Sequence, residues 1–137
     1  MFTAAGKDQT QLNSSYISVN DDDINQFASF GIDSHYSENM GPLIEHMMKN
    51  TRFRNLGSTA MHFAYVAKGS LIGAITNGTK LWDFAAGALL IENAGGIVTD
   101  HKGEKIFPID LEQYRKEPIA VLATNKKIHQ KTLELIK

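Results

Sequence analysis

The sequence predicts an α/β protein in which helices cover both faces of a mixed β-sheet of about five strands. Short apolar segments alternate with segments whose apolar residues recur at helical spacing, which is typical of layered α/β folds. The run PIAVLAT at 118–124 is apolar throughout, as expected of a central strand covered on both faces. With 137 residues and 42% hydrophobic composition, we expect 1–137 to form a single domain, with a loose start or a clipped edge strand over residues 1–13.

The composition excludes several classes of site and favours a reducing compartment. The chain carries 14 basic and 15 acidic residues, so no charge excess indicates a nucleic acid or an anionic membrane as partner. It has no cysteine, which rules out disulfides, thiolate zinc sites and cysteine nucleophiles. No apolar run approaches the roughly 20 residues of a membrane span, and the first residues do not resemble a signal peptide. We therefore expect a cytoplasmic protein.

The first half of the sequence alternates predicted strands with one helix. We expect strands at 16–19 (YISV), around 27–32, and at 52–57 (RFRNLG). Between the last two, the apolar residues of 37–50 recur at helical spacing, and Pro42 is compatible only with the first turn of a helix. The segment 37–50 is therefore predicted to be a helix whose methionines lie in the core.

The second half continues the alternation. Ser58 or Thr59 can cap a helix that stops before Gly69, and Gly95 with its neighbouring glycine ends a second helix. Asn125 is expected to cap the last helix. The predicted strands are 70–77, 97–100 and 118–124, and the predicted helices are 58–68, 84–93 and 125–137.

Asp83 is the first candidate functional residue, because it precedes the almost entirely apolar stretch FAAGALLIENAGG. Free N–H groups and the helix dipole favour an anion at a helix amino terminus. One interpretation is a plain helix cap; the other is a carboxylate that binds a hard cation. In the second case, Trp82 is expected to wall off one side of the site.

The turn LGSTA at 56–60 is the second candidate. Gly57 permits close approach of the backbone, and the N–H groups of Ser58, Thr59 and Ala60 open a helix. These groups are able to receive an oxyanion or a sugar hydroxyl, although an ordinary Ser/Thr cap explains the same pattern.

Other motifs for catalysis are absent from the sequence. The five histidines show no metal-ligand spacing, and there is no Walker loop, G-x-G-x-x-G or G-x-S-x-G motif. His62 lies within a predicted buried helix, so we interpret it as a core histidine whose hydrogen bonds are satisfied.

Taken together, two segments resemble the carboxy-terminal half of the inositol monophosphatase family. The family motif W-D-x-A-A-G corresponds to Trp82–Gly87, its following E-A-G-G corresponds to 92–96, and its upstream G-[ST]-x-A element corresponds to Gly57–Ala60. The tail IAVLATNKKIHQKTLELIK is similar to the closing strand and helix of that family. The resemblance covers nearly the whole chain and implies the layered fold of the family's carboxy-terminal domain.

The resemblance also implies a function. Enzymes of this family hydrolyse phosphate monoesters with Mg²⁺, which makes a small phosphorylated metabolite the expected substrate. Carried over to this sequence, Asp83 is a metal ligand, and Trp82 lies next to this ligand without binding the metal itself. The alcohol side of the substrate is lined by Gly57, Ser58, Thr59 and Ala60.

Two departures from the family pattern limit that expectation. The D-P-[IL]-D-G-T motif of the family's amino-terminal half, which carries most metal ligands, does not occur here. Members that act on inositol phosphate usually carry a glutamate at the position of Thr76. We therefore expect an isolated chain that is inactive and binds Mg²⁺ weakly or not at all, with an amino-terminal domain or a second copy as partner. The alternative is a non-enzymatic binding or assembly module that has kept the fold.

Overall fold

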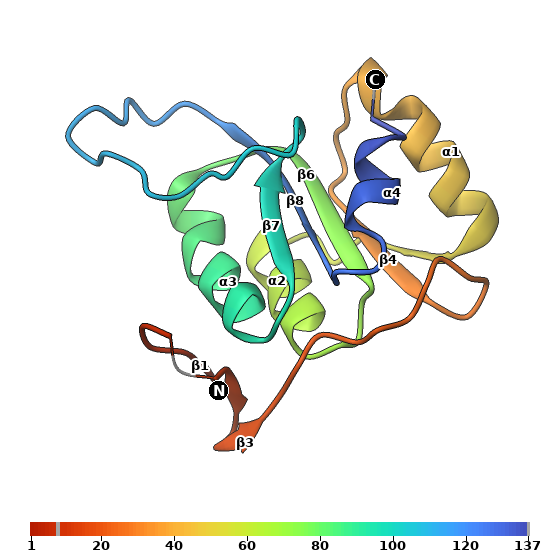
Figure 1. The fold of residues 1–137 in the computed structure, drawn as a ribbon. Coiled ribbons are helices and arrows are strands. Elements are labelled where there is room, and N and C mark those ends of the chain that lie inside the picture. Colours follow the sequence, from red (N-terminus) through yellow and green to blue (C-terminus); the bar gives the residue numbers. More distant parts are fainter. Residues whose placement is uncertain (8, 137) are drawn as a thin grey trace.

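The structure is a computed structural model that describes residues 1–7 and 9–136, and it contains two β-sheets (Figure 1). The strands are β1 (Phe2–Thr3), β2 (Gln11–Leu12), β3 (Ser15–Tyr16), β4 (Ser29–Ile32), β5 (Arg52–Arg54), β6 (Gly73–Thr79), β7 (Ile97–Asp100) and β8 (Ile119–Thr124). The helices are the 3₁₀ helix η1 (Glu38–Met40), α1 (Gly41–Asn50), α2 (Thr59–Ala67), α3 (Leu81–Asn93) and α4 (His129–Leu133).

The larger sheet is mixed and has the strand order β5-β4-β6-β8-β7. Strand β4 runs parallel to both β5 and β6, whereas β8 is antiparallel to both β6 and β7. This arrangement confirms the predicted mixed sheet of five strands. Because β4, β5 and β6 are parallel, their carboxyl ends meet at one edge of the sheet.

Helices cover both faces of this sheet, also as predicted, and each face has its own hydrophobic cluster. Successive residues of a strand point to opposite faces. Accordingly, Ala74 packs with residues of α2 and α3, while Ile75 packs with residues of α1. Strand β8 alternates in the same way, with Ala123 in the first cluster and Leu122 in the second.

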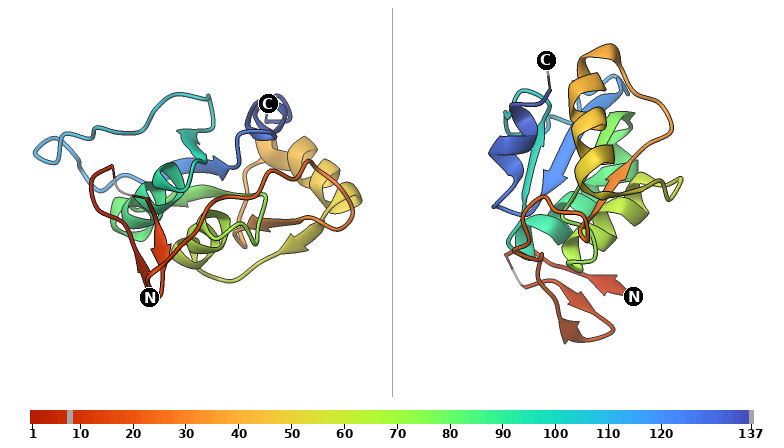
Figure 2. Two further views of the ribbon diagram at one scale, coloured as in Figure 1. Left: turned by 60° about the horizontal axis from the view of Figure 1, so that its bottom comes forward. Right: turned by 90° about the vertical axis from the view of Figure 1, so that its right-hand side faces the viewer.

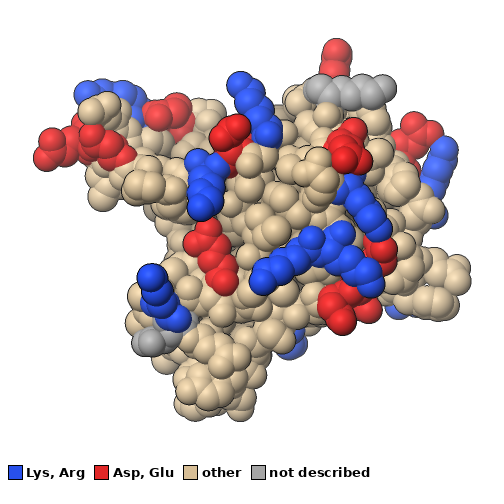
Figure 3. Space-filling view, viewed as in Figure 1, with Lys and Arg blue, Asp and Glu red and all other residues tan. Residues whose placement is uncertain are grey.

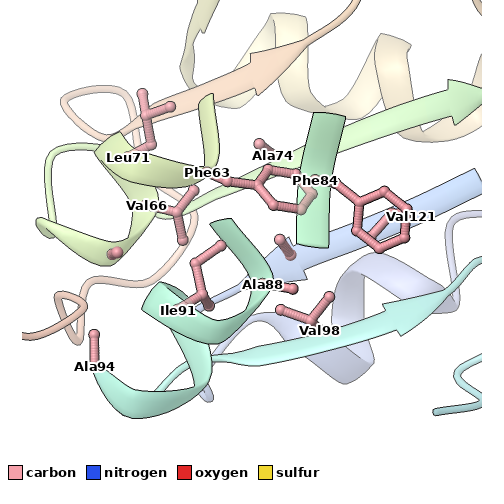
Figure 4. Close-up of a cluster of buried hydrophobic side chains, with 12 residues drawn as sticks. Phe63, Val66, Leu71, Ala74, Phe84, Ala88, Ile91, Ala94, Val98 and Val121 are labelled. Atoms are coloured by element: carbon pink, nitrogen blue, oxygen red, sulfur yellow. The ribbon is translucent and has the colours of Figure 1, made fainter. Parts of the chain in front are cut away.

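Helices α2 and α3 pack tightly against each other above one face of the sheet (Figure 4). The rings of Phe63 and Phe84 meet edge to face, with centroids 6.5 Å apart. Gly87 of α3 approaches Phe63 so closely that an added Cβ would lie 2.6 Å from the Phe63 Cβ. The small residues of α3 therefore bring the two helices, and their amino termini, close together.

The boundaries of two helices differ from those predicted. Helix α3 begins at Leu81 with Lys80 as its cap, so Asp83 lies inside the first turn and is not the capping residue. Helix α4 spans only His129–Leu133, because Asn125 accepts hydrogen bonds from the N–H groups of Lys127 and Ile128 in a turn that precedes the helix.

The first residues, where we expected a loose start or a clipped edge strand, form the antiparallel strands β1, β2 and β3 in the described part of the chain. This small sheet lies beside α2 and α3, far from α1 and α4 (Figures 1 and 2). The Thr10 hydroxyl donates to the Leu90 carbonyl of α3 at 2.6 Å, and Asn93 donates to the Gly6 carbonyl at 3.1 Å. Helix α3 thus anchors the segment through the Leu90 backbone carbonyl and the Asn93 side chain.

On the face seen in Figure 3, lysine and arginine side chains are interspersed with aspartate and glutamate side chains. Within residues 1–7 and 9–136, none of the helices has the length and apolar character that a membrane crossing requires.

Candidate functional site at the carboxyl edge of the sheet

Four segments that carry polar side chains gather where β4, β5 and β6 end. Asp33 follows β4 directly, the turn at Asn55–Ser58 follows β5, and Asn77 and Gly78 lie near the end of β6. The first turn of α3, with Asp83, comes next. In α/β sheets, ligands commonly bind at the carboxyl ends of parallel strands, so this edge is where a site is expected.

The structure brings the two motifs of the sequence analysis together. Asp83 and Gly57–Ala60 line one cavity of about 310 Å³. Asp83 is exposed in the first turn of α3, where its N–H donates to the Lys80 carbonyl at 2.9 Å. Trp82 is 62% exposed and is not among the lining residues of this cavity.

The turn at Gly57 is held by hydrogen bonds from both sides. Gly57 has a φ of +68°, a conformation that glycine adopts without the strain of a side chain. Its N–H donates to the Asn55 side chain at 2.8 Å, and the Leu56 N–H donates to Nε2 of His62 at 3.0 Å. Ser58 caps α2 by accepting from the Met61 N–H at 3.3 Å, so the capping interpretation of this turn is confirmed.

Capping does not use all the donors of this helix start. In an α-helix the first N–H groups have no carbonyl partner four residues earlier, and in α2 these include the N–H groups of Thr59 and Ala60. Both residues line the cavity with Asp83. The cavity thus combines backbone donors with one exposed carboxylate.

A second cavity, of about 360 Å³, adjoins the first and shares Gly57, Ser58 and Thr59 with it. Its other lining residues are Asp33, Ser34, His35, Asn77 and Gly78. The Asn55 side chain donates to the Ser34 hydroxyl at 2.8 Å and so links the loop after β4 to the loop after β5.

The sequence analysis did not identify these additional residues as a site. The available signal was a polar sequence, Asp33-Ser34-His35, directly after the strand predicted around 27–32. Only the parallel pairing of β4 with β5 and β6 shows that this segment lies beside Gly57.

Asp33 is the carboxylate of the second cavity, and it faces the buried His62. Its Oδ1 lies 3.6 Å from Nδ1 of His62, whose side chain is 1% exposed. Burial of the Asp33 carboxyl opposes ionisation, but the interactions with His62 and Thr76 outweigh burial and lower the pKa of Asp33 below its ordinary value of 3.8. The buried Thr76 hydroxyl makes no hydrogen bond of good geometry among the described residues, so His62 is the main partner that lowers the pKa of Asp33.

The residues present do not make a complete metal site. Mg²⁺ prefers near-octahedral coordination by oxygen and binds tightly only where several ligands converge. Across the described residues, no group of three or more histidine or acidic side chains comes together in a way that could hold a metal ion. Asp83 offers one carboxylate, which fits a ligand of a shared site but not a site of its own.

A larger cavity, of about 590 Å³, lies between α4 and the edge strand β7 and extends to the turn that follows β7. It contains neither Asp83 nor the Gly57 turn, so its size alone does not make it the functional site.

Comparisons with known proteins match the whole chain to one family. The profile of the inositol monophosphatase family matches residues 1–137. Inositol-1-monophosphatase ImpA of Mycolicibacterium smegmatis is 41% identical over 87 residues, which cover 64% of this chain and 29% of that protein. Nus factor SuhB of Escherichia coli is 53% identical over 51 residues, which cover 37% of this chain and 19% of that protein.

A solved structure extends the match to the three-dimensional fold. The extragenic suppressor protein suhB from Bartonella henselae superimposes with a TM-score of 0.83 at 25% sequence identity, covering 99% of this chain and 51% of that chain. The chain thus spans about half the length of that relative. The predicted resemblance to the carboxy-terminal half is confirmed, and the chain belongs to the inositol monophosphatase family.

Proposed function

We propose that this chain is the carboxy-terminal part of a Mg²⁺-dependent phosphate-monoester hydrolase of the inositol monophosphatase family. The observation that carries this proposal is the cavity lined jointly by Asp83 and Gly57–Ala60. A carboxylate beside free backbone donors suits a ligand that has a metal-bound anionic part and a hydroxylated part. The proposed substrate is therefore a small phosphorylated metabolite.

Each group has a separate proposed role. Asp83 contributes one ligand to Mg²⁺, and the metal would stabilise charge on the phosphate when it is bound. Gly57, Ser58, Thr59 and Ala60 line the alcohol side, where hydroxyls and backbone N–H groups orient the ester. Trp82, which we expected to wall off one side of the site, is exposed and does not line this cavity, so it has no role in the proposal.

The isolated chain is expected to be inactive, because a single carboxylate does not hold Mg²⁺ in a defined position. The experiment compares phosphate release from myo-inositol 1-phosphate by three samples with Mg²⁺. These are the chain alone, the chain fused to the amino-terminal half of a family member, and that half alone. Turnover by the fusion only would support the proposal, and robust turnover by the chain alone would contradict the assignment of roles.

The alternative is a non-enzymatic binding or assembly module. The Escherichia coli relative is named a Nus factor and not a phosphatase, which supports this alternative. Leu56, Met61 and Trp82 are 42%, 44% and 62% exposed and flank the cavity residues in the sequence, so an apolar partner surface could bind here. A well-folded fusion that binds Mg²⁺ but releases no phosphate from any phosphorylated polyol would favour this alternative.

A further inference from the structure

The pairing of Asp33 with His62 is not explained by the roles proposed above. His62 is among the largest fully buried side chains of the protein, yet its ring contacts two polar groups at the functional edge. Nε2 accepts the Leu56 N–H at 3.0 Å, so in the neutral ring the proton is on Nδ1. Nδ1 is the atom that lies 3.6 Å from Oδ1 of Asp33.

This arrangement gives Asp33 a defined orientation and charge. One carboxylate oxygen faces His62, while the side chain remains 26% exposed and lines the second cavity. The lowered pKa of Asp33 keeps the carboxylate ionised at neutral pH. An ionised carboxylate accepts hydrogen bonds and donates none, so it attracts hydroxyl groups and repels phosphate.

The other groups of the cavity complement such an acceptor. Asn77 accepts a hydrogen bond from the Ser37 hydroxyl at 2.8 Å through Oδ1, which leaves its NH₂ group as a donor. Ser58 and Thr59 add hydroxyls, and both also line the cavity of Asp83. A ligand that spans the two cavities would therefore have its anionic end near Asp83 and its hydroxyl-rich end near Asp33.

We propose that Asp33 is a specificity-determining residue that binds neighbouring hydroxyl groups of a polyol, and that His62 positions it through Nδ1. The inference rests on the proposed function in one respect: the polyol is taken to be the alcohol part of the phosphate ester. Asp33 thus determines which alcohol the site accepts, whereas Asp83 contributes a metal ligand at the phosphate end of the ester.

The test measures polyol binding to the full 137-residue chain by ¹H–¹⁵N NMR, with myo-inositol as the probe and cyclohexanol as the matched ring without neighbouring hydroxyls. Myo-inositol is expected to shift the amide resonances of Gly57, Ser58 and Gly78, and cyclohexanol is not. Asp33→Asn should weaken myo-inositol binding roughly tenfold or more, because hydrogen bonds to a charged group are worth about 1.5–3 kcal/mol. Asp22→Asn is the control and should leave binding unchanged. The Asp22 side chain is exposed, and its backbone carbonyl accepts a hydrogen bond from the Asn125 side chain at the opposite end of the strands.

Two variants of His62 separate positioning from simple structural support. Asn places its NH₂ group near the site of Nδ1, whereas Gln places its amide near the site of Nε2. His62→Asn should therefore keep most of the affinity for myo-inositol, and His62→Gln should lose about as much as Asp33→Asn. Equal losses in both His62 variants, with native-like spectra, would overturn the positioning role.

The outcomes also separate this inference from the proposed function. Absence of myo-inositol binding to the wild-type chain, or equal binding by the wild type and Asp33→Asn, would overturn the inference whatever the activity of the fusion. Conversely, an inactive fusion would count against the proposed phosphatase even if Asp33 binds the polyol as described, because the NMR measurement needs neither Mg²⁺ nor turnover.

Discussion

Gly87 of α3 lies against Phe63 of α2 so closely that an added Cβ would come within 2.6 Å of the Phe63 Cβ and 3.2 Å of its ring. This contact sets the distance between the two helices. Since α2 begins next to the Gly57 turn and α3 begins next to Asp83, the same contact sets the width of the cavity between them. The packing of the core and the geometry of the site are therefore linked.

Gly87→Ala is expected to destabilise the protein by about 1–3 kcal/mol, because overpacking a well-packed core costs this much. The loss should appear even though alanine has a higher helix propensity than glycine by about 1 kcal/mol. Chemical denaturation measures the change. Gly41→Ala is the matched control, since an added Cβ there has no heavy atom within 4 Å, and it should be neutral or slightly stabilising.

Asp83→Asn in an active fusion is expected to reduce kcat by two orders of magnitude or more, because the change removes the ligand charge while keeping the shape of the side chain. Initial rates at saturating Mg²⁺ and substrate provide the measurement. Asp22→Asn is the control and should retain the wild-type rate. A fusion that keeps full activity with Asp83→Asn would contradict the metal-ligand role.

Mg²⁺ should bind the isolated chain weakly, with a Kd in the millimolar range or weaker, since one carboxylate supplies little of the coordination that the ion requires. Isothermal titration calorimetry and the NMR shifts of Asp83 and its neighbours report the affinity. A micromolar site, or shifts centred far from the Gly57 turn, would show that other residues hold the metal.

The stability of the protein is expected to decrease as the pH falls below about 6.5, because of His101 and His129. Burial lowers the pKa of both side chains from the ordinary value of 6.5. The folded state therefore binds fewer protons than the unfolded state in this range, and acid favours unfolding. The His129 ring lies 3.1 Å from the Thr99 hydroxyl and 2.8 Å from that of Thr124, both buried.

The pH dependence is measured as the free energy of unfolding in urea between about pH 5 and 8. His129→Asn should lower stability at neutral pH and flatten the decrease on the acid side. His46→Asn, at a partly exposed position of α1, is the control and should leave the slope unchanged. An unchanged slope in His129→Asn would show that this histidine does not carry the effect.

Local sequence was sufficient to predict the existence and order of most elements. Apolar runs with turn residues at their ends predicted β8 and β7, and small apolar residues at helical spacing predicted α2 and α3. Predictions were poorest at boundaries, where interactions with other segments decide. The Ser37 hydroxyl before the 3₁₀ turn donates to Asn77, and the Leu81 N–H at the start of α3 donates to the Tyr114 hydroxyl. The Asn125 side chain in the turn before α4 donates to Asn20.

The sequence by itself determined the family, the mixed α/β fold, and the two motifs at Asp83 and Gly57–Ala60, because these depend on residue types at fixed local spacing. The tertiary structure decided how the motifs meet, since the parallel pairing of β4 with β5 and β6 brings distant segments to one edge. It also decided the surroundings of Asp33. The family resemblance suggests a carboxylate at position 76, where this chain has threonine, and only the fold places Asp33 close to Thr76 and His62. A contact between residues far apart in the chain depends on the packing of whole elements, and no local pattern specifies it.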